Sequence, residues 1–199
     1  MQPETEAKTN SILAELKEKT AAQHQQTEDT VDLMREDFNL DDYKNLLVRF
    51  YSFYKPFEEK MRELSAADPI EFDHAERLNT PKLFKDLREL GMSENEIAEI
   101  KESDELPRLD SKEKIFGALY VIEGSTLGGQ VIARHLKQKF DIDAATGGAF
   151  FAGYGKETGT MWRAFGAAIT KFAENSANHD EIIAGANETF EFIGKSLRG

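Results

Sequence analysis

The chain has 199 residues, with 37 acidic and 25 basic side chains and a formal net charge of −12. This charge argues against a general nucleic-acid or anionic-membrane partner, because both need a positive field. Since cysteine is absent, there is no disulfide, no Cys-ligated metal and no thiolate nucleophile. No signal-peptide pattern or stretch of 18 apolar residues appears, so we expect a cytoplasmic protein. We expect residues 1–10 to be a flexible lead-in and residues 11–199 to form one domain.

Helical periodicity dominates the first third of the chain. We expect the first helix to begin at a capping residue, Asn10 or Ser11, and to run to about Val31. A second helix follows residues 39–42, and Pro56 is expected to kink it near its middle. Its aromatic side chains could form a pocket wall or plain core, and we favour core; they are Phe50, Tyr51, Phe53, Tyr54 and Phe57.

The next helices carry clear start and stop signals. Residues 80–81, Thr-Pro, open a helix that Gly91 closes. Ser93 and Glu96 then form a capping box for a short charged helix that should end near Ser103. No segment shows the alternation of a strand, so the sequence predicts an all-α fold of seven or eight helices.

A long helix, residues 112–139, is expected to begin at an Asp110 cap and carries three glycines in its middle. Gly124, Gly128 and Gly129 each weaken a helix by about 1 kcal/mol relative to alanine. Without a Cβ, the backbone there can bend and let a bulky group approach closely. Two interpretations stay open at this point: a kink over a pocket, or a small-residue face where another helix crosses.

The first helix carries a histidine with polar partners on one face. Lys17, His24 and Glu28 are spaced by seven and four residues, which places them on one side. A carboxylate one turn after a histidine can hold Nδ1–H and leave Nε2 for a metal. The alternative is an ordinary surface histidine. With no zinc, phosphate-loop or nucleophile motif elsewhere, the remaining features suit a flat apolar ligand with an iron atom, held between two helices.

Two segments resemble the heme oxygenases that make biliverdin. Residues 16–28, with Leu16-Lys17-Glu18, Thr20, His24 and Glu28, resemble the proximal helix of that family. Residues 124–130, Gly-Ser-Thr-Leu-Gly-Gly-Gln, resemble its kinked distal helix. The resemblance extends weakly over residues 11–198 and implies the same fold, with heme between these two helices.

This resemblance implies residue roles. His24 would be the axial iron ligand, Glu28 its orienting partner, and Lys17 the partner of one heme propionate. Gly124, Gly128 and Gly129 would let the distal backbone come close to the heme. Heme b would be both cofactor and substrate, opened with O2 and reducing equivalents to biliverdin, CO and ferrous iron.

One departure concerns Ser125, where the animal-type motif has an aspartate that organises distal water. Bacterial members often carry Gly-Ser there, so we expect a different water network around an active site. Thr126 and Leu127 complete the heme-lining part of this segment, and Gln130 is an auxiliary candidate. For the second propionate the sequence leaves three candidates, which are Tyr154, Lys156 and Arg163.

Two functions stay open on the sequence. The first is an active heme oxygenase, which needs an electron donor such as ferredoxin or a flavin reductase and would supply biliverdin to a bilin-binding photoreceptor or free iron. The second is a non-catalytic heme-binding or heme-sensing module on the same fold. We further suggest a donor-docking patch at Arg134, Lys137 and Lys139.

Overall fold

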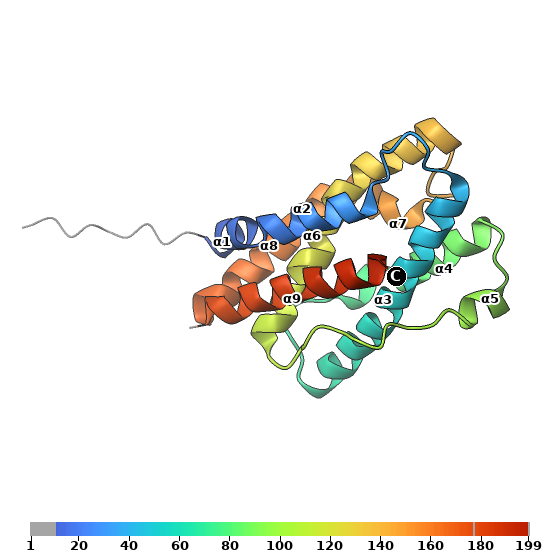
Figure 1. Ribbon diagram of the computed structural model, residues 1–199. Coiled ribbons are helices and arrows are strands. Elements are labelled where there is room, and N and C mark those ends of the chain that lie inside the picture. Colours follow the sequence, from blue (N-terminus) through green and yellow to red (C-terminus); the bar gives the residue numbers. More distant parts are fainter. Residues whose placement is uncertain (1–10, 177, 199) are drawn as a thin grey trace, which may run out of the picture.

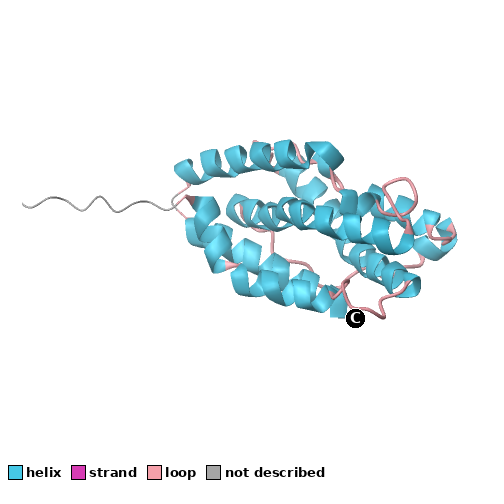
Figure 2. Ribbon diagram, turned by 90° about the horizontal axis from the view of Figure 1, so that it is seen from above, coloured by secondary structure: helices cyan, strands magenta, loops and turns pink. Residues whose placement is uncertain are grey.

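The computed structural model describes residues 11–176 and 178–198, so the expected flexible lead-in and the Asn10 cap lie outside the described residues. Helices joined by loops make up the fold, and the described part of the chain contains no strand (Figures 1 and 2). The all-α prediction is therefore confirmed. The helices are α1 (Ile12–Lys19), α2 (Ala21–Val31), α3 (Leu40–Ala67), α4 (Thr80–Glu89), α5 (Glu94–Ala98), α6 (Lys112–Phe140), α7 (Ala149–Ala152), α8 (Thr158–Asn175) and α9 (His179–Arg198), with 3-10 turns η1 (Ala75–Arg77) and η2 (Gly155–Glu157).

The expected first helix is two helices, α1 and α2. The backbone leaves helical geometry at Thr20, with φ −111° and ψ 1°. The Thr20 hydroxyl donates a hydrogen bond of 2.7 Å to the Leu16 carbonyl, an interaction that often bends helices. Ser11 caps α1 as predicted, because its side chain accepts a bond from the Ala14 amide.

Two other predicted boundaries need correction. Ser111, not Asp110, is the N-cap of α6, and Asp110 instead pairs with Lys114 at 2.8 Å. The capping box of Ser93 and Glu96 is confirmed, but α5 ends at Ala98 rather than near Ser103. Both errors concern helix ends, where local signals compete with tertiary contacts.

The core lies around α6 and the aromatic face of α3. The side chains of Phe53, Tyr54 and Phe57 are at most 2% exposed, which confirms the core interpretation of this stripe. Pro56 lies inside α3, which the structure shows as one helix. The closest helix crossing joins α6 and α9: a Cβ added at Gly117 would overlap the Ile182 carbonyl and lie 2.7 Å from the Ala186 nitrogen.

We expect Gly117→Ala to destabilise the protein by about 3 kcal/mol, because the new methyl group meets the rigid backbone of α9. Urea unfolding of the protein without hemin measures this effect. Gly128→Ala is the matched control on the same helix, since a Cβ there meets nothing within 4 Å. Equal stability of the two variants would contradict the close crossing of α6 and α9.

Helix α6 is also long and apolar enough to cross a membrane by length and composition, which corrects the expectation that no such stretch exists. However, 56% of the apolar window is buried inside the structure. The core helix of a soluble protein passes the same test, so α6 is weak evidence for a membrane span.

Candidate functional site

The three central glycines of α6 have three different surroundings. Gly124 faces the Trp162 ring, 3.6 Å from its added Cβ, which is ordinary van der Waals contact. Gly128 faces open space. A Cβ at Gly129 would lie 2.7 Å from the Phe151 carbonyl oxygen, so this glycine allows α7 to pack closely on α6. The interpretation as a small-residue face therefore holds for Gly129, whereas a pocket beside Gly124 and Gly128 stays a prediction.

An apolar surface of α6 is exposed around Gly128. Leu127 and Val131 are 42% and 53% exposed and belong to the four large apolar side chains exposed in the described part of the chain. With Gly124 and Gly128 they follow the i, i+3, i+4, i+7 spacing of one helix face. An exposed apolar face of this kind suits an apolar ligand.

Ser125 and Thr126 follow the first of these glycines and differ in exposure. Ser125 is exposed and donates to the Ile122 carbonyl at 2.7 Å, whereas Thr126 is buried and donates to the Glu123 carbonyl at 2.6 Å. Such bonds from side chain to backbone favour bending. Figure 1 shows α6 changing direction between its two halves, in line with the expected kink.

The helix α2 presents His24 to solvent. None of the α2 residues is buried, and the His24 side chain is 57% exposed. Its Nδ1 lies 3.7 Å from Glu28 Oε1, and its ring forms a T-shaped pair with Phe190 of α9 at a centroid distance of 5.8 Å. This imidazole is therefore accessible for a ligand, with a carboxylate one turn away to orient it.

A contact between Thr20 and Tyr120 relates α2 to the glycine segment. Burial raises the pKa of Tyr120, and its hydrogen bond with the Thr20 side chain opposes that shift. His24 follows Thr20 by four residues and Gly124 follows Tyr120 by four, or about 6 Å along each helix. In Figure 1, α2 and the second half of α6 both run toward the right from this region. His24 and Gly124 thus each follow this contact by about one turn of their own helix.

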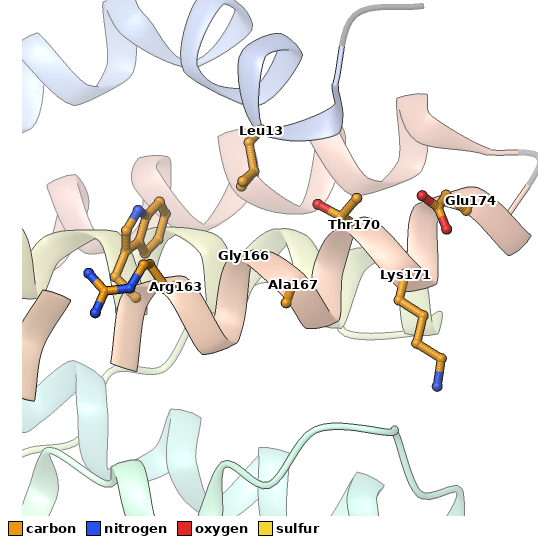
Figure 3. Close-up of a pocket in the computed structure, with 8 residues that line it drawn as sticks. Leu13, Arg163, Gly166, Ala167, Thr170, Lys171 and Glu174 are labelled. Carbon is orange, nitrogen blue, oxygen red and sulfur yellow. The ribbon is translucent and has the colours of Figure 1, made fainter. Parts of the chain in front are cut away.

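A groove of about 540 Å³ between α1 and α8 adjoins this region (Figure 3). Leu13 of α1 points toward α8, and Trp162 and Arg163 line the groove from α8. Lys17 follows Leu13 by one turn of α1 and is exposed, as is Arg163. Lys156 is exposed on η2, so three predicted cations remain available to an anionic ligand.

Tyr154 lies elsewhere, in a buried polar cluster that sequence reasoning missed. Its hydroxyl donates to Glu123 Oε1 at 3.0 Å, and Arg77 pairs with Glu123 Oε2 at 2.7 Å. Burial raises the pKa of Glu123, and the Arg77 guanidinium opposes that shift. The Tyr154 hydroxyl is therefore used inside the protein, and we drop it as a propionate candidate. The only local signal was a glutamate in the apolar run of α6.

Gln130 and Tyr54 also have structural partners near the glycines. Gln130 Nε2 donates to the Ala152 carbonyl at 2.7 Å, which ties α6 to α7. Tyr54 of α3 is buried beside Ser125: burial raises the pKa of Tyr54, and a hydrogen bond with the Ser125 side chain opposes that shift. Ser125 is thus the point where the exposed face meets the buried aromatic core.

Comparison with known proteins names the family. A model of the heme oxygenase family matches residues 10–198. The chain belongs to the heme oxygenase family. A heme oxygenase of Xanthomonas campestris pv. campestris (strain 8004) is 30% identical over 150 residues, which cover 75% of this chain and 85% of that relative. The family relationship makes this chain a heme-degrading enzyme.

A solved structure supports the same fold. The NO- and CO-bound heme oxygenase from Neisseria meningitidis superimposes with a TM-score of 0.74 at 26% sequence identity. The match covers 96% of this chain and 92% of that chain. The heme-oxygenase-like helical fold predicted from the two segments is confirmed.

The described residues fit a heme. The exposed imidazole supplies a nitrogen ligand of the type that iron accepts, and the exposed Leu127 and Val131 supply apolar surface for a porphyrin. Gly128 leaves open space on the same face. Lys17 and Arg163 are exposed cations, a charge that would suit carboxylates on such a ligand.

Proposed function

We propose that this member of the heme oxygenase family opens heme b with O2 and reducing equivalents to biliverdin, CO and ferrous iron. The observations that carry the proposal are the exposed His24 imidazole on α2 and the exposed apolar face of α6, which has a glycine open to solvent. The bound heme would supply both the iron that activates oxygen and the ring that is opened. The proposal treats residues 11–199 as one domain.

In this proposal His24 Nε2 binds the iron and Glu28 holds Nδ1–H, which keeps the imidazole neutral and oriented. Gly128 keeps a side chain out of the space proposed for the ligand, and Gly124 lets the Trp162 ring pack against α6 beside it. Leu127 contacts the ring, and Ser125 holds water near Tyr54. Gly129 and Thr126 act indirectly, since Gly129 packs on α7 and the Thr126 hydroxyl bonds within α6.

Lys17, Arg163 and Lys156 are the proposed partners of the two propionates. We expect Lys17→Ala and Arg163→Ala each to weaken hemin binding about threefold, and the double variant about tenfold, as is typical of exposed charge pairs. Fluorescence quenching of Trp162 by hemin gives the affinity. Hemin dimethyl ester should bind all variants equally, and Lys171→Ala is the control on α8 because Lys171 pairs with Glu71 at 2.7 Å. A similar loss with the ester would contradict propionate contacts.

A protein electron donor, such as ferredoxin or a flavin reductase, is part of this proposal, as is a cytoplasmic location. The suggested docking patch loses support, because Lys137 pairs with Asp141 at 2.6 Å and Asp143 at 3.1 Å. Lys139 donates to the carbonyls of Arg35 and Glu36. Both lysines therefore bond to groups of the same chain. Supply of biliverdin to a bilin-binding photoreceptor and release of iron remain the two proposed roles.

The test is an absorption time course of the hemin complex in air, with ascorbate as reductant and catalase present. We expect the Soret band to bleach while a broad red biliverdin band grows. A stable Soret band, both here and with a ferredoxin and its reductase, would instead favour the heme-binding module. No Soret change on adding hemin would contradict both functions.

A further inference from the structure

Glu123 directly precedes Gly124 and points away from the exposed face of α6. Its side chain is 1% exposed, although a carboxylate is rarely buried without partners. Those partners come from two distant parts of the chain: Arg77 in η1 at 2.7 Å and Tyr154 before η2 at 3.0 Å. Lys82 of α4 adds positive charge, with its Nζ 4.5 Å from the centre of the Tyr154 ring.

The Arg77 guanidinium also reaches α8. Its Nη1 donates to the Met161 carbonyl at 3.3 Å, and the next residue, Trp162, places its ring against Gly124. Arg77 further stacks over Phe72, with 4.5 Å from the guanidinium carbon to the ring centre. One buried ion pair therefore ties α6 to α8 at the level of the first glycine.

This ion pair stands where α6 itself is weakest. Three glycines follow Glu123 within six residues, and glycine lowers the intrinsic stability of a helix. The exposed side of this segment has no packing partner at Gly128. Tertiary contacts on the buried side must therefore determine where the backbone of this segment lies.

We propose that Glu123 is a positioning residue: its buried ion pair with Arg77 fixes the turn of α6 that carries Gly124 and Ser125, and holds Trp162 against Gly124. Glu123 does not touch the ligand in this arrangement, and acts through the backbone of the glycine segment. The consequence of this ion pair for heme chemistry rests on the proposed function. Its effect on the backbone position of α6 does not.

The first experiment uses the full chain without hemin and measures amide hydrogen exchange by mass spectrometry. We expect at least about tenfold faster exchange in residues 121–131 of Glu123→Leu, and a smaller increase in Glu123→Gln, which keeps a polar group for Tyr154. Lys114→Met is the control on the same helix, because the mostly buried Lys114 pairs with the exposed Asp110 and lies about 14 Å before Glu123 along α6. Unchanged exchange in this segment, or equal changes in the control, would overturn the proposal.

The double variant Arg77→Met/Glu123→Leu tests whether the faster exchange in Glu123→Leu comes from lost positioning or from a buried Arg77 without its partner. Removing both partners leaves no uncompensated charge, so a simple charge effect would return exchange to that of the natural protein. We expect the double variant to keep fast exchange in residues 121–131, because the tie to α8 is still missing. Full return to the natural rate would contradict the positioning role.

The hemin complex gives a second readout. We expect the acid–alkaline transition of ferric hemin, followed in the visible spectrum, to shift by about one pH unit in Glu123→Gln and not in Lys114→Met. An unshifted transition alongside faster exchange would overturn the part of the proposal that concerns the heme. If the natural protein fails to degrade hemin, the proposed function fails, while the exchange result without hemin still decides the role of Glu123.

Discussion

Replacing His24 with alanine is expected to abolish hemin turnover and to leave the fold of the hemin-free protein unchanged. The side chain is 57% exposed and α2 buries none of its residues, so the free energy of unfolding should change by less than about 0.5 kcal/mol. Loss of the axial nitrogen should lower turnover at least about 100-fold and change the Soret and visible bands. Hemin titration, the absorption time course and urea unfolding measure these three quantities.

The control for this variant is His179→Ala, which removes another partly exposed histidine, 3.7 Å from Glu15. It should retain the natural spectrum and turnover. Added imidazole should restore the natural spectrum of His24→Ala, because a free ring can occupy the space of the missing side chain. If His24→Ala keeps the natural spectrum and rate without added imidazole, a different residue binds the iron.

Replacing Gly128 with leucine should also abolish turnover. His24→Ala removes a side chain that binds the iron, whereas Gly128→Leu adds a side chain where the heme is proposed to lie. A Cβ at this position meets nothing within 4 Å, so the protein without hemin should be as stable as the natural one or gain about 1 kcal/mol from better helix propensity. The leucine would instead fill the space that the heme needs. We expect hemin affinity to fall at least about tenfold, measured by fluorescence titration.

Gly129→Ala is the matched variant one residue later, and its expected result is the reverse. The new Cβ would lie 2.7 Å from the Phe151 carbonyl oxygen, so α7 must move and stability should fall by about 1–3 kcal/mol. Urea unfolding of both hemin-free variants gives this comparison. If Gly128→Leu binds and degrades hemin normally, the ligand does not lie against this face of α6.

Local spacing explains what could be predicted about the site. His24 and Glu28 share a helix face because four residues make about one turn, and no tertiary contact can change that spacing. The Ser93 capping box was predicted correctly for the same reason. Helix ends were less predictable: Thr20 interrupts the first helix through a hydrogen bond that helix propensity does not reveal.

Pairings across the fold could not be predicted from spacing. Arg77 and Glu123 are 46 residues apart in the chain, and Tyr154 is 31 residues beyond Glu123. Lysines that formed a basic cluster in the sequence, Lys137 and Lys139, have partners within the chain. Each of these pairings depends on how helices pack, because a side chain can bond only to the groups that packing brings within reach.

The sequence by itself determined the helical class, the face that His24 shares with Glu28, and the glycine segment of α6, since each follows from periodicity or composition along one helix. Tertiary structure alone decided what surrounds each glycine: Gly128 faces open space, Gly129 packs on α7 and Gly124 contacts Trp162. It also directed Tyr154 into the buried cluster of Arg77 and Glu123. The physical reason is that the sequence shows only where a side chain is missing. What lies in the space beside each glycine depends on the segments that pack against α6.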